Sequence, residues 1–200
     1  MQEIVPGIFT WPWFSERHGY NFNGYLVCTA EGNICIDPVE PDAPTLDAIT
    51  RLGVKHIVLT NRNHARAANV VRACTNARTA IHPDDAAYAR GQGAIIDADL
   101  QVTQQVGPLV VIGVSGKSPG EVAFHWPQRR LLVVGDAVIG NPPGHCGLLP
   151  DKVIDDSKRL RASVRQLLDL DFDALLVGDG SCIMTGAHDR LRELVETFPA

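Results

Sequence analysis

The apolar segments of this chain fall into two successive series, and this repeat constrains the fold more than any other feature. Each series consists of short strand patterns followed by segments with helical periodicity. The first predicts a hairpin over residues 25–29 and 33–37 and a buried strand over residues 56–60. The second predicts strands over residues 109–113, 121–125 and 130–134. Because each sheet must bury an apolar face, the two series predict an α/β (α+β) fold with two sheets packed face to face and covered by helices.

Apolar residues at helical spacing separate and follow these strands. Thr45 is a candidate cap for a helix after the first hairpin, and the Ala-rich residues 65–73 predict another. Near the end of the chain, two more helices are predicted on either side of a short strand at residues 174–178. The first of these two has Asp156 and Ser157 as capping candidates.

Composition and charge narrow the class of protein. The 200 residues, of which 45% are hydrophobic, predict a single domain over residues 1–200. A net charge of −5, with Lys and Arg spread among acids, disfavours nucleic acid as a partner. No leader or membrane-spanning stretch is present, so we expect a soluble cytoplasmic protein with no membrane partner. The five cysteines form no C-x-x-C pair, and we expect most to be reduced and buried.

Polar residues gather in four segments that directly follow apolar strand patterns. In α/β layers, the loops beyond the carboxyl ends of strands tend to carry function, because helix starts and free backbone groups meet there. We therefore expect the four segments to converge on one site. They are Thr60-Asn61-Arg62-Asn63-His64-Ala65-Arg66, Ser115-Gly116-Lys117-Ser118-Pro119-Gly120-Glu121, Gly135-Asp136 and Gly178-Asp179-Gly180.

The order and spacing of these segments resemble those of metallo-β-lactamase-fold hydrolases along nearly the whole chain. In that family a strand ending in Thr leads into His-x-His-x-Asp-His, and a later turn reads Gly-His-(Ser/Thr)-Pro-Gly. A Gly-Asp pair follows, and a last strand ends in Gly-His-Gly. The resemblance implies a four-layer αββα sandwich and a hydrolase by family.

The family's metal ligands, however, are mostly replaced here, and only Asp136 keeps its identity. An Asn side chain is a weak neutral donor, while Lys and Arg offer only donors and positive charge. We therefore expect no bound metal and no other cofactor. The resemblance places the following residues at the seven ligand positions: Asn61, Asn63, Ala65, Arg66, Lys117, Asp136 and Asp179.

Two acids that face one cavity without a metal need compensating charge, since burying them unpaired would be costly. If Asp136 and Asp179 occupy the family's positions, Lys117 and Arg66 point into the same cavity. We hypothesise that these two cations replace the metal and pair with the carboxylates. An ion cluster with a purely structural role would contain the same pairs.

His64 is the only imidazole in the first segment and lies one residue from a family histidine position, so a shifted loop would make it a ligand. The chain also resembles a divergent branch that reads Thr-Asn-x-x-His-x-Arg, Gly-x-Lys-x-Pro-Gly-Glu and Gly-Asp-Gly, and that is usually labelled only hydrolase-like. Asn61 and Asn63 equally suit a strand-to-helix turn, in which their side chains bind backbone groups.

The aromatic residues between positions 9 and 22 are compatible with a pocket wall or lid, with core packing and with a homodimer contact. Nothing in the sequence around Cys146 indicates an activated thiolate.

Three functions remain open. One is a residual hydrolase, with Lys117, Asp136 and His64 as catalytic candidates. Such an enzyme would use either Lys117 as a base or a metal held by Asp136, Asp179 and His64. Another is a non-catalytic partner-binding protein. The function we favour is metal-free binding of a small polar or anionic ligand by Asn61, Asn63, His64, Arg66, Lys117, Asp136 and Asp179.

Overall fold

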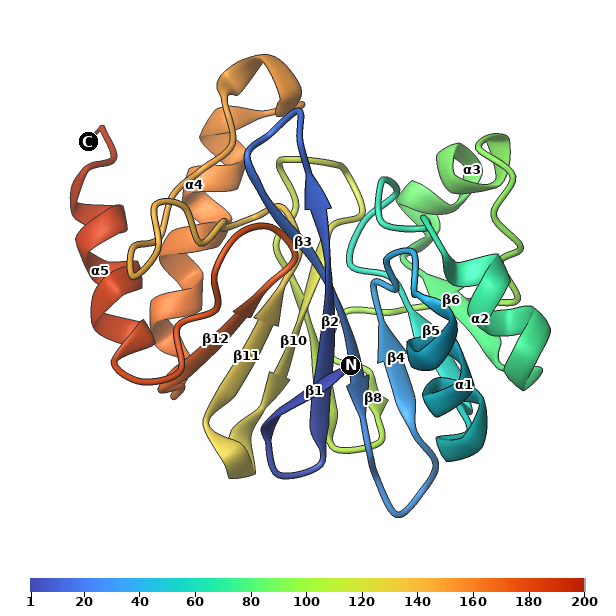
Figure 1. The fold of residues 1–200 in the computed structure, drawn as a ribbon. Helices are drawn as coiled ribbons and strands as arrows, with labels where there is room; N and C mark the ends of the chain where they lie inside the picture. Colours follow the sequence, from blue (N-terminus) through green and yellow to red (C-terminus); the bar gives the residue numbers. More distant parts are fainter. Residues whose placement is uncertain (200) are drawn as a thin grey trace. The chain divides into compact units, whose positions relative to one another are not determined.

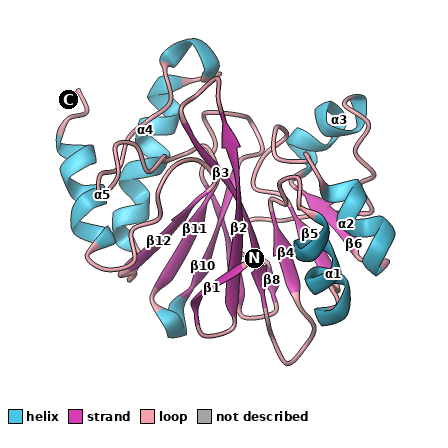
Figure 2. Ribbon diagram, in the orientation of Figure 1, coloured by secondary structure: helices cyan, strands magenta, loops and turns pink. Residues whose placement is uncertain are grey.

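The computed structural model describes residues 1–199, and the chain forms two compact units. Unit 1 is Met1–Gln101, and unit 2 is the rest of the chain from Val102. Each unit contains one sheet with its own helices (Figure 2), so the predicted α/β class is confirmed. The same residues include no helix that is long and apolar enough to cross a membrane.

The sheet of unit 1 is antiparallel in its first half and parallel in its second half (Figure 1). Parallel neighbours need crossover connections, which here contain helices α1 (Ala43–Leu52), α2 (Ala68–Thr75) and α3 (Pro83–Gly91). In spatial order the strands are β1 (Gln2–Val5), β2 (Ile8–Ser15), β3 (Tyr20–Val27), β4 (Ile34–Ile36), β5 (His56–Val58), β6 (Arg78–Ile81) and β7 (Ala98–Asp99).

Unit 2 has a smaller sheet against which α4 (Ser157–Gln166) and α5 (Ala187–Glu196) pack. Leu160 and Val164 of α4 and Leu191 of α5 lie in one buried cluster with side chains of the sheet. Only the pair β11–β12 is parallel among the strand pairs described in this unit. In spatial order the strands are β12 (Ala174–Val177), β11 (Leu131–Val134), β10 (Val122–Trp126), β9 (Leu109–Gly113) and β8 (Gln105–Val106).

Helix caps confirm one expectation and correct another. Asp156 caps α4 as predicted, because its side chain accepts the Arg159 N–H at 2.9 Å. Thr45, in contrast, does not cap α1. The cap is Asp42, whose carboxylate accepts the Thr45 N–H at 2.9 Å, and Thr45 is the donor of that bond.

The aromatic residues near the N-terminus lie mainly on β2 and β3, and they divide between the core and the surface. Trp11 is buried and its indole N–H donates to the Val39 carbonyl at 2.9 Å. Gly24 lies opposite this ring, where an added Cβ would come within 2.9 Å of it. Trp13 is 45% exposed and stacks on Phe22 at 5.7 Å between ring centroids. Trp11 is therefore a core residue, while Trp13 and Phe22 line a surface hollow.

Candidate functional site

A buried hydrogen-bonded network stands at the carboxyl ends of β4 and β5 in unit 1. Asp37 follows β4, and its carboxylate accepts the Thr60 N–H at 2.8 Å and the Thr60 hydroxyl at 2.5 Å. Asp37 Oδ2, the oxygen that accepts the hydroxyl, lies 2.8 Å from Nδ1 of His64. All three residues are at most 1% exposed. His64 is therefore fixed by an acid one strand away in the sheet, and this orients its ring in the manner of a carboxylate–histidine pair.

Asn61 shapes the turn that carries His64. Its side-chain oxygen accepts the Asn63 N–H at 2.8 Å, and its carbonyl accepts the His64 N–H at 3.1 Å. Asn61 is buried and Asn63 is exposed. These contacts bear out the strand-to-helix-turn role that the sequence suggested for Asn61.

Two guanidinium groups of this loop lie over aromatic rings. The Arg62 guanidinium lies 4.7 Å from the centroid of the Tyr88 ring, and that of Arg66 lies 4.3 Å from the Phe22 ring. Such contacts hold a cation by its face while its N–H groups remain directed outward in the guanidinium plane. The pairing of Arg66 with the carboxylates stays a prediction.

Unit 2 contains a buried ion pair at the ends of its own strands. Lys117 Nζ lies 2.7 Å from Asp136 Oδ2, and the two side chains are only 8% and 6% exposed. The pairing predicted for Lys117 with Asp136 is thus present. The turn that carries Lys117 is held by α4, since the Asp156 N–H donates to the Gly116 carbonyl at 2.8 Å.

Asp136 and Asp179 leave neighbouring strands at the same edge of the sheet. Val134 pairs with Val177 in the parallel β11–β12 ladder, and each acid follows its valine by two residues. Both acids are 4% exposed. The Gly140 N–H donates to the Asp179 carbonyl at 2.9 Å, which ties the two loops together. Two of the predicted site residues therefore lie on adjoining loops because of strand register alone.

Sequence comparison gives the family. A profile of the metallo-beta-lactamase superfamily matches residues 2–198. The chain belongs to this superfamily. Its two sheets and their helices are consistent with the superfamily's αββα sandwich. A comparison with curated proteins gives no match.

Several solved structures are similar to this chain over most of its length. A protein crystallised in a di-iron-bound form is 26% identical, with a TM-score of 0.70, and the alignment covers 90% of this chain and 98% of that one. A metallo-beta-lactamase from Pontibacter korlensis has a TM-score of 0.80 at 17% identity and 98% coverage of both chains. One from Erythrobacter litoralis, with beta mercaptoethanol in its active site, has a TM-score of 0.74 at 17% identity, covering 98% and 96%. The last two likenesses concern the fold alone.

Asp37 was absent from the residues expected at the site. Its signal in the sequence is an acid directly after an apolar strand and before Pro38. That pattern does not show which residues Asp37 binds. Asp37 lies beside Thr60 because β4 pairs with β5 in parallel, and this pairing is not visible in the local sequence. Arg62 was likewise missed.

The cysteines are not mostly buried, which corrects the expectation. Of the five, Cys35 alone is fully buried, Cys74 is exposed and the other three are intermediate. Burial, followed by the nearby Glu193 carboxylate, raises the pKa of the Cys146 thiol to about 12. A thiol is nucleophilic only as the thiolate, so Cys146 is no candidate nucleophile at neutral pH.

We predict that iodoacetamide at pH 8 alkylates Cys74 and leaves Cys146 largely unmodified. The thiolate fraction of Cys146 there is roughly a thousandfold below that of an ordinary thiol with a pKa of about 8.5. Because the pKa is raised, the alkylation rate of Cys146 should keep increasing with pH beyond 10. Peptide mapping by mass spectrometry measures both sites, and a plateau for Cys146 near pH 9 would contradict the prediction.

Proposed function

We propose that this member of the metallo-β-lactamase superfamily binds a small polar or anionic ligand without a bound transition metal. The observation that supports this most is the buried ion pair between Lys117 Nζ and Asp136 Oδ2, at 2.7 Å. By family resemblance Asp136 is a metal-ligand position and Lys117 replaces a histidine ligand. The ammonium group supplies next to Asp136 the positive charge that a metal ion supplies in relatives.

The donor set does not fit a transition metal. A divalent ion bound to Asp136 would share its carboxylate with an ammonium group, and the two cations would repel each other strongly in a buried place. Asn61, at another ligand position, uses its side-chain oxygen to accept the Asn63 N–H. Asn63 itself is exposed.

The kind of ligand follows from the cations. Lys117 and Arg66 offer positive charge and hydrogen-bond donors and no acceptor, which suits carboxylate or phosphate groups. Arg66 is exposed and its guanidinium is supported by the Phe22 ring. His64 and Asp179 would bind other polar groups of the ligand, because their side chains offer an imidazole and a carboxylate.

One alternative is a residual hydrolase with a metal held by His64, Asp136 and Asp179. Each of these residues is buried and offers one ligand atom. The hydrogen bond of His64 Nδ1 to Asp37 is also compatible with a ligand histidine, because such histidines donate their second N–H to a carboxylate. Two alternatives remain. One is a hydrolase that uses Lys117 as a base, and the other is a non-catalytic protein whose cavity is closed and which binds a protein partner.

Metal analysis separates these functions. We expect protein purified without chelator to hold far less than one equivalent of zinc, iron or manganese by plasma mass spectrometry. Lys117→His should raise the retention of zinc at least about tenfold, since it removes a cation and adds an imidazole ligand. Lys158→His, which adds an imidazole to an exposed position of α4, is the matched control and should change nothing.

Stoichiometric metal in the unaltered protein, removable by chelator with a loss of thermal stability, would reject the proposal in favour of the residual hydrolase. Lys117→Gln is a second variant. Its circular dichroism spectrum shows whether unit 2 folds without the Lys117 ammonium group.

A further inference from the structure

The end of the β2–β3 hairpin in unit 1 extends beyond the strands on either side of it (Figure 1). The two strands of the hairpin pair with each other from Ile8 to Ser15 of β2. In contrast, β1 pairs only with residues 8–10 of β2, and β4 pairs only with residues 25–27 of β3. The rest of the hairpin is therefore a ribbon of two strands. Two strands alone cannot bury an apolar face, so such a face needs a partner from elsewhere.

Aromatic side chains lie on both faces of this ribbon. Phe14 is 57% exposed, and its neighbour Trp13 is 45% exposed. Because successive side chains of a strand point to opposite faces, the two rings lie on opposite sides of the ribbon. Trp13 stacks on Phe22, whereas the described residues give Phe14 no aromatic contact. Neighbouring exposed apolar side chains of this size are typical of a surface that binds another molecule.

The face of the ribbon that carries Trp13 borders a hollow of about 350 Å³. A cavity of roughly 150 Å³ with an apolar lining accommodates benzene, so this hollow has room for a phenyl ring. Most of its side chains are apolar, and the guanidinium of Arg66 lies against the Phe22 ring. The lining comprises Trp13, Phe22, Val39, Glu40, Arg66 and Ala67.

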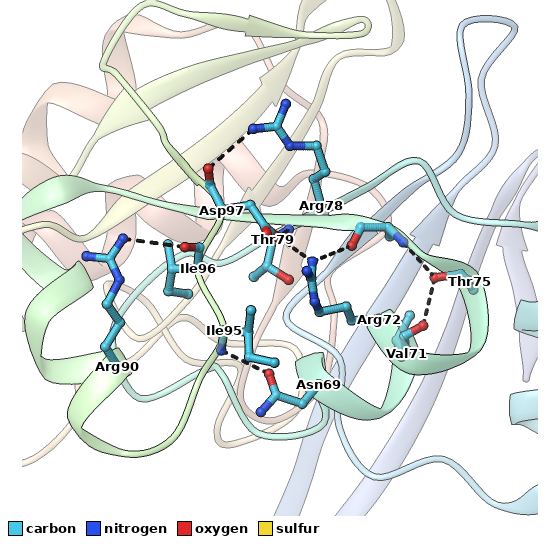
Figure 3. Close-up of polar contacts among 11 residues, drawn as sticks. Asn69, Val71, Arg72, Thr75, Arg78, Thr79, Arg90, Ile95, Ile96 and Asp97 are labelled. Carbon is cyan, nitrogen blue, oxygen red and sulfur yellow. Dashed lines mark hydrogen bonds and ion pairs between the residues drawn. The ribbon is translucent and has the colours of Figure 1, made fainter.

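Two opposite charges accompany these apolar groups. Glu40 lines the hollow and is exposed, and Arg17 is exposed in the turn of the hairpin. Within residues 1–199, neither side chain has a described hydrogen bond or ion pair. Other arginines of unit 1 are bound within the unit. Arg72 binds the Asp97 carboxylate, and Arg78 donates to the Asp97 carbonyl at 3.3 Å (Figure 3).

The hairpin turn is held in place by its own contacts. The N–H groups of His18 and Gly19 donate to the Ser15 carbonyl at 3.1 and 2.8 Å. Nδ1 of His18 lies 2.7 Å from the Ser15 hydroxyl oxygen, and the His18 ring lies 5.4 Å from the Phe22 ring between centroids. A turn that is ordered in advance loses little conformational freedom when it binds, and this favours association.

We propose that two copies of this chain associate reversibly through these hairpins. Phe14 of each copy enters the hollow of the other, and Arg17 pairs with Glu40 across the contact. Because both copies use the same surface, each pairing occurs twice and the contact closes as a dimer. The partner subunit's Phe14 then covers the hollow beside Arg66, a residue of the proposed ligand site. The inference goes beyond the proposed function and does not depend on it.

The first test measures association of the full-length protein by analytical ultracentrifugation over a dilution series. We expect a monomer–dimer equilibrium, and Phe14→Ser should raise its dissociation constant at least about tenfold. Tryptophan emission should shift to shorter wavelengths as the protein is concentrated, because association removes water from the Trp13 ring. Leu52→Ser is the matched control, since Leu52 of α1 is 45% exposed and does not line the hollow. It should change neither measurement.

Charge reversal tests the pair of Arg17 with Glu40. Arg17→Glu and Glu40→Arg should each weaken the dimer at least about tenfold, and the double variant should restore most of the affinity, because opposite charges then face each other again. The single variants change the net charge in opposite directions, so a loss in both is not an effect of net charge. Arg51→Glu, at an exposed position of α1 outside the hollow, is the control. Circular dichroism spectra confirm that each variant is folded.

A protein that stays monomeric at every concentration would overturn the inference, and so would a dimer that Phe14→Ser leaves intact. Equal weakening by Leu52→Ser would mean nonspecific association of apolar surfaces and would also overturn it. A double charge variant that binds no more tightly than the single variants would contradict the pairing of Arg17 with Glu40. Metal content enters none of these measurements, so the proposed function is tested independently of the dimer.

Discussion

Replacing Gly116 by alanine is expected to lower the free energy of unfolding by about 3–5 kcal/mol, the sum of overpacking and backbone strain. An added Cβ would lie 2.6 Å from the Leu160 Cβ and closer still to the Leu160 backbone. The obstacle is thus α4 itself, which cannot move aside as a flexible side chain would. Gly116 also has a φ of +144°, a conformation that alanine rarely adopts.

Two other glycines allow the cost of backbone strain to be measured without the steric clash of an added Cβ. Gly144 and Gly186 have φ values of +83° and +67°, and an added Cβ at either would meet no atom within 4 Å. Their alanine variants should lose only about 1 kcal/mol, the cost of a left-handed conformation. Urea denaturation followed by circular dichroism gives all three values. If Gly116→Ala lost no more than Gly186→Ala, the turn that carries Lys117 would not be seated on α4.

The sequence predicted those parts of the fold in which the local residue pattern matches the burial of the residues in the structure. The strands β9 to β12 are short apolar runs between turn residues, and each was found within one or two residues of its bounds. The ion pair of Lys117 with Asp136 was also predictable, because two buried acids require a cation wherever the loops place them.

Elements that depend on tertiary contacts were missed. In β2, Pro12 and a run of aromatic residues hide the strand pattern, and its pairing with β3 over the whole length from Ile8 to Ser15 compensates. In α3 the apolar residues are mostly alanines, which give little contrast with the polar face. The position of Arg62 beside Tyr88 was therefore out of reach, since α3 supplies that ring.

The other large loss of stability is expected from Asp37→Ala, which should cost about 3–5 kcal/mol of the free energy of unfolding. The substitution leaves the Thr60 N–H, the Thr60 hydroxyl and His64 Nδ1 without the buried carboxylate that they share. A buried donor that loses its partner has no water to replace it. Asp37 also has a φ of +47°, which asparagine and aspartate tolerate better than alanine.

Two variants divide this cost into its parts. Asp37→Asn keeps one accepting oxygen and the backbone preference, so it should lose roughly half as much. Thr60→Val removes only the hydroxyl and should lose about 1–2 kcal/mol. Urea denaturation gives the stabilities, and the imidazole nitrogen signals of His64 report whether its ring still donates through Nδ1. If Asp37→Ala matched Thr60→Val in stability and left those signals unchanged, the carboxylate would not be what orients His64. The ring would then be held by its other contacts, which include the Thr60 hydroxyl 3.0 Å from His64 Nδ1. The order of effects Asp37→Ala, Asp37→Asn, Thr60→Val is what distinguishes the two cases.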